Sequence, residues 1–233
     1  MLGILFSETD VNYKGTICLV IDDFGYAHNE TIEGYFSMEK DFSIAIIPGH
    51  IYSQSIGEIA DSLDFEIIIH MPMEPYNYDS LSEKGFILSE SLNANEVEER
   101  IDLAFLEIPM AVGMNNHQGS KASANRRVMN VMGTILKEHG KYFLDSRTTK
   151  KTQAENVMRT LGVPTGRRHV FLDNEPDENS IIQQLSLLAE KANTGGFAVG
   201  IGHVKENTLM VLQREIPRLK ADNFEFVFVS KVV

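Results

Sequence analysis

The chain of 233 residues alternates short apolar runs, rich in β-branched and aromatic residues, with stretches of helical periodicity. This alternation is typical of a parallel sheet whose strands are joined by crossover helices, and it limits the fold more than any other feature. Several runs are apolar throughout, as strands buried on both faces are. We expect strands at residues 16–21, 42–47, 65–70, 111–115, 142–145, 169–172, 197–201 and 224–229. About eight strands with helices between them predict a barrel or a wide open sheet.

The intervening helices are expected at residues 93–108, 124–140, 152–162 and 177–193. A content of 43% hydrophobic and 23% charged residues suffices for one sizeable core. We therefore predict a single domain over residues 15–233, preceded by an N-terminal extension over residues 1–14. The one long irregular segment, residues 72–91, is expected to be functional or mobile.

Charge and hydropathy exclude several partners. The net charge of −12 argues against nucleic acid and against an anionic membrane surface, because both are bound by basic faces. No run of eighteen apolar residues is present, so no membrane span is expected. The first ten residues lack the basic start of a signal peptide. The single cysteine, Cys18, lies inside the first apolar run and is expected to be a core residue.

Aspartate or histidine follows six of the apolar runs. The carboxyl ends of parallel strands share one rim of a barrel or one edge of a sheet, so these side chains are expected to converge. They are Asp22, Asp23, His70, His117, Asp145, Asp173 and His203.

A structural reading competes with a chemical one at several of these positions. An aspartate after a strand often forms a turn or caps a helix, and Asp145 and Asp173 both precede helical patterns. His28, His50 and His139 fall in loops or at a helix end, and we expect them to be structural.

Histidine and carboxylate side chains on one rim are the donors that a divalent metal such as Zn²⁺ needs. A cation would also explain two adjacent acids at the end of a buried strand. One carboxylate would bind the ion, while its neighbour would take a proton from the attacking water. His203, which arrives from another strand, would protonate the leaving group. These residue types predict metal-assisted hydrolysis with a separate base and acid.

Other catalytic motifs are weak. The "GIG" sequence at residues 200–202 follows a strand but lacks the third glycine of a dinucleotide-binding fingerprint. No serine lies in a G-x-S-x-G elbow, so a nucleophilic triad finds no support.

The strand-end motifs resemble those of metal-dependent polysaccharide deacetylases, and most closely the divergent branch of that family. "IDDFG" resembles the family's "TFDDG", "HMPMEP" resembles H-[ST]-x-x-H-P, and "IGH" resembles the closing L-x-H motif. "NNHQGS" and "FLDSRT" complete the divergent pattern, and the resemblance spans nearly the whole chain. It implies a distorted (β/α) barrel of about seven to eight mainly parallel strands. It also implies that Asp22 is the base, that Asp23 and His70 are metal ligands, and that His203 is the acid.

The motifs depart from the family in three places. Glu74 stands where the second ligand histidine would be, so the third ligand is either Glu74 or, as we prefer, His117. The R-x-P-[FY] segment that supplies an oxyanion contact is absent. The D-x-x-D-W motif is also absent, which leaves Asp173 or Asp145 to orient His203.

Glu74, Asn116 and Arg147 are expected to bind substrate near the same rim. We expect one divalent metal, Zn²⁺ in the first instance, and removal of acetyl groups from a polysaccharide or cell-envelope glycan. The alternatives are a non-catalytic glycan- or peptidoglycan-binding module on the same barrel, and a metal-dependent hydrolase of another amide or ester bond. A cell-envelope substrate implies an extracytoplasmic location, with a cytoplasmic one left open. The oligomeric state is not predicted.

Overall fold

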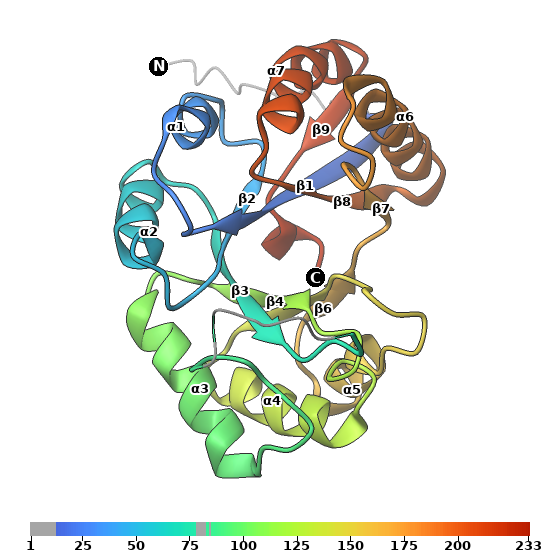
Figure 1. Cartoon of the computed structure of the whole chain (residues 1–233). Helices are drawn as coiled ribbons and strands as arrows, with labels where there is room; N and C mark the ends of the chain where they lie inside the picture. The colour runs from blue at the N-terminus through green and yellow to red at the C-terminus, as the bar shows by residue number, and fades with distance from the viewer. Residues whose placement is uncertain (1–12, 78–82, 84) are drawn as a thin grey trace, which may run out of the picture.

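The computed structural model describes residues 13–77, 83 and 85–233 and forms an α/β half-barrel (Figure 1). The central strand β1 (Gly15–Phe24) pairs along one edge with β8 (Phe197–His203). Its other edge pairs with β2 (Ser43–Ile46) near the carboxyl end and with β9 (Phe224–Phe226) near the amino end. The remaining strands are β3 (Ile67–Met73), β4 (Gly113–Gln118), β5 (Tyr142–Asp145), β6 (Thr165–Arg167) and β7 (Val170–Phe171).

The eight main strands follow the order β6-β5-β4-β3-β2-β1-β8-β7, and all their pairings are parallel. The sheet curls into an incomplete barrel, whose two edge strands are β6 and β7. These two strands are consecutive in the chain, and the barrel is open between them. This arrangement confirms the predicted distorted (β/α) barrel.

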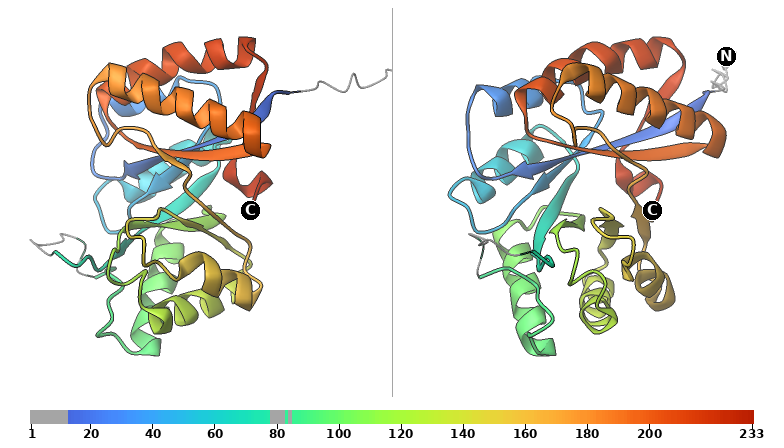
Figure 2. Two further views of the ribbon diagram at one scale, coloured as in Figure 1. Left: turned by 90° about the vertical axis from the view of Figure 1, so that its right-hand side faces the viewer. Right: turned by 45° about the vertical axis from the view of Figure 1, so that its right-hand side comes forward.

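The helices lie outside the curled sheet, with α6 and α7 on one side and α3, α4 and α5 on the other (Figure 2). Their bounds are α1 (Glu30–Phe36), α2 (Ser53–Ser62), α3 (Ala94–Glu107), α4 (Arg126–Glu138), α5 (Ala154–Leu161), α6 (Glu178–Gly195) and α7 (Glu206–Ala221). Local signals fix several starts: Asn93 and Glu96 form a capping box at α3, and the side chain of Asp177 caps α6. The short helices α1 and α2 were not predicted.

The sheet separates two apolar layers, because side chains alternate between its faces. Ile17, Leu19 and Ile21 of β1 pack outward under the helices. Cys18 and Val20 point to the concave side, where the C-terminal turn η1 (Val229–Lys231) covers them. Cys18 is fully buried, which confirms its prediction as a core residue.

Strand boundaries differ from the expected ones in a consistent way. β1, β3 and β4 continue past the predicted ends, because the residues that follow, polar in β4 but apolar in β3, still pair in the ladder. β6 was not predicted, and the expected strand at residues 224–229 ends at Phe226. The irregular segment at 72–91 begins within β3, and its residues 78–82 and 84 lie outside the described residues. So does most of the predicted N-terminal extension, and the domain division stays a prediction.

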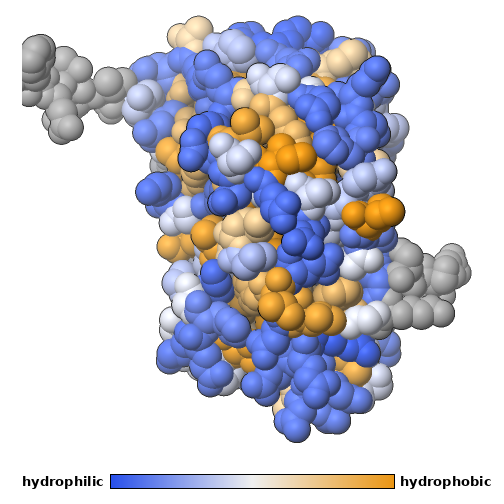
Figure 3. Space-filling view, turned by 90° about the vertical axis from the view of Figure 1, so that its left-hand side faces the viewer, coloured by the Kyte–Doolittle hydropathy of each residue, from blue (hydrophilic) through white to orange (hydrophobic). Residues whose placement is uncertain are grey.

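The face that carries α1, α2 and α3 shows hydrophobic side chains among hydrophilic ones (Figure 3). Ile51 is 86% exposed and Leu106 is 77% exposed. Isolated apolar residues of this kind are ordinary on a protein surface. Among the described helices, none combines the length and apolarity needed to cross a membrane.

Candidate active site

The end of β1 brings two adjacent carboxylates to one side of the sheet. The β1–β2 register passes from Ile21 opposite Ile44 to Phe24 opposite Ile46, so β1 holds one extra residue there. Asp23 adopts a left-handed backbone with φ of 72°, and Gly25 has φ of 112°. A β-bulge of this type redirects a side chain that a regular strand would send to the opposite face. Asp22 and Asp23 can therefore serve one site.

Three predicted metal ligands converge beside this bulge. Oδ1 of Asp23 lies 3.5 Å from Nε2 of His70 and 3.3 Å from Nδ1 of His117, and the two ring nitrogens are 3.1 Å apart. His70 comes from β3 and His117 from β4. These three side chains form the candidate metal group of the described residues.

The spacing of these three atoms fits a metal ion. A tetrahedral ion with bonds of about 2.0–2.1 Å holds its ligand atoms about 3.3 Å apart. Oδ1 of Asp23 is buried and, within the described chain, takes part in no hydrogen bond of normal geometry. An oxygen in this position would otherwise carry a desolvation cost, which a bound cation would offset. Asp23, His70 and His117 are thus suited to hold a divalent ion.

Asn115 orients two of the site residues. Its Oδ1 accepts a hydrogen bond from Nδ1 of His70 at 2.7 Å, and its Nδ2 donates to Oδ1 of Asp22 at 2.8 Å. Since an amide oxygen only accepts, Nδ1 of His70 carries the proton and Nε2 presents a lone pair toward the metal group. Asn115 is fully buried in β4, and the sequence pattern did not single it out.

Electrostatics separate the two acids. Burial raises the pKa of Asp22, against the opposing effects of His70, His203 and the Asn115 hydrogen bond. Burial would also raise the pKa of Asp23, but His117 and His70 hold that pKa well below its usual range. Asp23 is therefore the firmly ionised carboxylate, as a ligand should be, and Asp22 is the more basic one.

His203 ends β8 directly opposite Asp22 in the β1–β8 register. Its Nδ1 is hydrogen bonded to Oδ1 of Asp173 at 2.8 Å, and Oδ2 of Asp173 accepts from the backbone N of His203 at 2.9 Å and from Thr208 Oγ1 at 2.8 Å. Burial would lower the pKa of His203, but Asp173 and the acids of β1 raise it above its usual value. Of the two candidate partners for His203, Asp173 makes the contact.

Asp22 and His203 line one cavity of about 480 Å³, together with His70 and His117. This size suits a small-molecule or sugar site. The cavity also includes residues that the sequence analysis had not selected: Gln118, Ser146, Thr148, Arg168, Phe171 and Asn174. The sequence "GRRHVFLDN" could have pointed to Arg168, because this residue directly precedes the strand expected at residues 169–172.

Of the other predicted site residues in and after β4 and β5, two line the cavity and one stabilises the loop beside it. Asn116 and Arg147 line the cavity, as expected. The Asn116 side chain also braces the loop after β5, accepting from Ser146 N at 2.9 Å and donating to Gln118 O at 2.7 Å. Asp145 contacts neither Asp22 nor His203 and does not line the cavity. Its carboxylate accepts from Arg147 N at 2.8 Å and Thr152 Oγ1 at 2.9 Å, so it holds the loop.

Glu74 lies away from the metal group. Its Oε1 pairs with Lys121 Nζ at 2.8 Å and its Oε2 accepts from Glu90 N at 3.0 Å. It borders a different cavity, next to Tyr76 and Arg100. The structure therefore favours His117 over Glu74 as the third ligand, and Glu74 does not line the cavity that holds Asp22 and His203.

Backbone strain is concentrated around the cavity. Five non-glycine residues of the described chain have a left-handed backbone. Three of them lie at the site: Asp23 and Gln118 at the carboxyl ends of β1 and β4, and Arg147 shortly after β5. Such residues cost free energy and are retained at functional sites more often than elsewhere.

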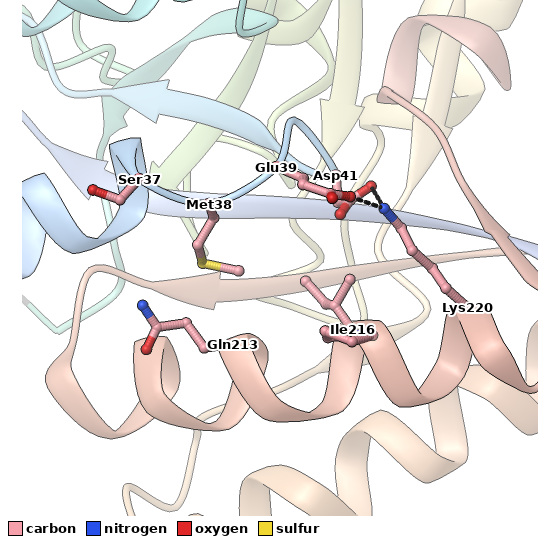
Figure 4. Close-up of a pocket in the computed structure, with 8 residues that line it drawn as sticks. Ser37, Met38, Glu39, Asp41, Gln213, Ile216 and Lys220 are labelled. Carbon is pink, nitrogen blue, oxygen red and sulfur yellow. Dashed lines mark hydrogen bonds and ion pairs between the residues drawn. The ribbon is translucent and has the colours of Figure 1, made fainter.

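The remaining histidines, and a separate cavity beside α7, do not join this site. His28, His50 and His139 each pair with a nearby glutamate or aspartate, and His169 accepts from Val199 N. A cavity of about 420 Å³ lies between the α1–β2 connection and α7 (Figure 4). The Lys220 ammonium there is paired with Glu39 at 2.6 Å and Asp41 at 2.7 Å.

The parallel half-barrel and its strand-end acids and histidines define a deacetylase-like α/β fold. The chain belongs to the divergent polysaccharide deacetylase family, whose model matches residues 19–233. Uncharacterized proteins of Haemophilus influenzae and Escherichia coli are each 35% identical to it over 209 residues, which are 90% and 89% of this chain. The chain spans 74% of the length of the first relative and 64% of the second.

Solved structures share the fold at low identity. An uncharacterized protein of Agrobacterium tumefaciens C58 has a TM-score of 0.89 and 19% identity, covering 94% of this chain and 89% of its own. A CE4 family pseudoenzyme from Bacillus anthracis has a TM-score of 0.57 and 10% identity, covering 95% and 66%. The catalytic domain of a peptidoglycan N-acetylglucosamine deacetylase from Eubacterium rectale has a TM-score of 0.50 and 15% identity, covering 93% and 90%.

Proposed function

We propose that this protein is a metal-dependent hydrolase that removes acetyl groups from a polysaccharide or cell-envelope glycan. One observation carries the proposal: the Asp23, His70 and His117 group lies beside Asp22, and Asp22 shares its cavity with His203. Family membership supplies the class of substrate.

The roles of the side chains follow from their contacts. A divalent ion held by Asp23, His70 and His117 would polarise the acetyl carbonyl and stabilise the charge that develops on its oxygen. Asp22 would accept the proton of the attacking water, because burial makes it the more basic acid and Asn115 fixes its orientation. His203 would protonate the departing amine or alcohol through Nε2, since Nδ1 is bonded to Asp173.

The likeness to a peptidoglycan N-acetylglucosamine deacetylase supports an N-acetylated glycan as the substrate class to test first. A substrate of the cell envelope would require an extracytoplasmic location, which we propose on that basis.

Acetate release tests the activity directly. The zinc-loaded full chain is incubated with acetylated oligosaccharides, acetylated peptides and phosphoesters, with a chelator-treated sample as control, and phosphate release is measured beside acetate release for the phosphoesters. We expect metal-dependent acetate release from the oligosaccharides alone. Turnover of peptides or phosphoesters in place of sugars would reject the substrate class, and turnover unaffected by complete metal removal would reject the metal dependence.

A non-catalytic glycan-binding module is the second candidate. The fold likeness to a CE4 pseudoenzyme from Bacillus anthracis favours it, as does the replacement of the family's second ligand histidine by Glu74. A mutant of that pseudoenzyme is described as having restored enzymatic activity. A binding module needs no separate base and acid, so the presence of Asp22 and His203 in one cavity favours the enzyme. Glycan binding without acetate release would support the module.

A further inference from the structure

Two arginines, Arg147 and Arg168, line the cavity that the proposed function assigns to the substrate. Within the described residues, neither forms an ion pair with a carboxylate, whereas Arg159, Arg167, Arg214 and Arg218 each do. Arg100, Arg126 and Arg127 also lack an ion pair within the described residues, but they lie outside this cavity. Arg147 and Arg168 are therefore the unpaired guanidinium groups that the cavity itself presents.

Arg168 is held rigidly at the junction between β6 and β7. Its Nε donates to Ser146 O at 2.7 Å and its Nη2 donates to Arg147 O at 3.2 Å. Its guanidinium stacks over the ring of Phe171, 4.6 Å from the centroid, and that ring in turn packs against His203 at 5.1 Å. No described residue is bonded to Nη1. The group is therefore pre-organised beside the proposed acid and retains free donors.

The loop bonds of Arg147 involve its backbone and leave its side chain available. Its N–H donates to Asp145 and its carbonyl accepts from Arg168, which holds the residue at φ of 52°. Within the described chain, the Arg147 guanidinium has no hydrogen bond of its own. Residues other than glycine rarely adopt a left-handed backbone, so the loop keeps a strained conformation at the residue that places this side chain in the cavity.

The cavity is also lined by neutral side chains that can form hydrogen bonds, including Thr148 and Asn174. Among the described residues that line the cavity, Asp22 is the only carboxylate. The cavity thus combines one acid and three histidines with two arginines.

We propose that this cavity selects an acetylated glycan that carries an anionic substituent, a carboxylate or a phosphate, near the acetylated position. The inference rests on the proposed function, since it takes the cavity to be the glycan site. Guanidinium forks match both anions through paired hydrogen bonds. The two arginines bind the anion and orient the acetyl group toward the metal group.

Direct binding tests the selectivity without relying on turnover. The probes are N-acetylglucosamine, its 6-carboxylate, its 6-phosphate and N-acetylmuramic acid, which carries its carboxylate at O3. Affinities are measured by ligand-observed NMR for the metal-loaded full chain and for Arg147→Gln and Arg168→Gln. Arg167→Gln is the matched control, because it removes the same charge next to Arg168 from a side chain that pairs with Glu155 at 3.3 Å.

We expect at least one anionic sugar to bind at least about tenfold more tightly than the neutral one, which corresponds to about 1.4 kcal/mol. The advantage is lost in Arg147→Gln and Arg168→Gln and retained in Arg167→Gln. The difference between carboxylate and phosphate probes identifies the anion. Equal binding of all four sugars, including no binding of any, overturns the inference, as does an advantage that survives both cavity substitutions.

Acetate release, measured in parallel, separates this inference from the proposed hydrolysis. Selective binding without acetate release contradicts the hydrolase and supports the anion selectivity. Acetate release at equal rates from neutral and anionic sugars supports the hydrolase and overturns the selectivity.

Discussion

Asp22 and Asp23 are neighbours in the chain, and each places one carboxylate oxygen 3.5 Å from the same atom, Nε2 of His70. A regular strand would direct them to opposite faces of the sheet. The extra residue in β1 and the left-handed backbone of Asp23 remove that conflict. A single backbone irregularity thus brings both carboxylates to one site, as the proposed division between metal ligand and base requires.

The turn that follows depends on Gly25. A Cβ there would lie 2.9 Å from the backbone O of Ile47, and φ of 112° excludes most side chains. We expect Gly25→Ala to lower the free energy of unfolding by about 2–4 kcal/mol, measured by urea denaturation. Gly140 has φ of 64° but no atom within 4 Å of its Cβ position, so Gly140→Ala should cost only about 1 kcal/mol. Equal losses in the two variants would show that the contact with Ile47 is unimportant.

Asp22 is expected to be essential for turnover but not for metal binding. Asp22→Asn keeps the shape and removes the base, so acetate release should fall by about 10²–10⁴-fold with metal content unchanged. Asp177→Asn, at the exposed cap of α6, controls for a general effect of the substitution. Undiminished turnover in Asp22→Asn would reject its role as base.

The pH dependence should report the pairing of His203 with Asp173. Because the pKa of His203 is raised in the folded protein, its acid form persists above the ordinary value of about 6.5 and is lost as the pH rises through the raised pKa. Asp173→Asn removes the stabilising charge, so the alkaline fall of kcat/KM should move to lower pH. An alkaline limb at the same pH in both proteins would mean that another group is the acid.

Asn115 should control metal affinity without touching the metal. Asn115→Ala removes the acceptor that fixes the ring and tautomer of His70, and loss of such a partner weakens metal binding by about 10–100-fold. Competition with a chromogenic chelator measures the change. Asn130→Ala, on the exposed face of α4, should leave the affinity unchanged. A similar affinity in Asn115→Ala and the parent protein would contradict the positioning role.

The sequence was sufficient to predict the rim of the site, because parallel strands bring their carboxyl ends together whatever the intervening helices are. The structure brings Asp22, Asp23, His70, His117 and His203 together as this pattern predicts, and their chemical roles stay predictions. The bulge in β1 could not be predicted, since it depends on the pairing of β1 with β2. It explains how two successive residues reach one face.

The residues that orient the site side chains were harder to identify from the sequence. Asn115 and Asn116 are adjacent and chemically identical, and only the strand alternation of β4 decides that Asn115 contacts His70 while Asn116 braces the β5 loop. Asp145 and Asp173 both follow strands, but only Asp173 lies next to His203. Arg168 was missed because β6, which precedes it, spans three residues and gave no strand pattern, so the position between two strands was not recognised.

Metal content of the purified full chain tests the central claim most directly. After incubation with Zn²⁺ and removal of excess ion, elemental analysis should find about one equivalent in the parent protein. His117→Ala should lose it and Glu74→Gln should retain it, because Glu74 pairs with Lys121 and not with the metal group. A parent protein that holds no metal, or a His117→Ala variant with full occupancy, would contradict the account.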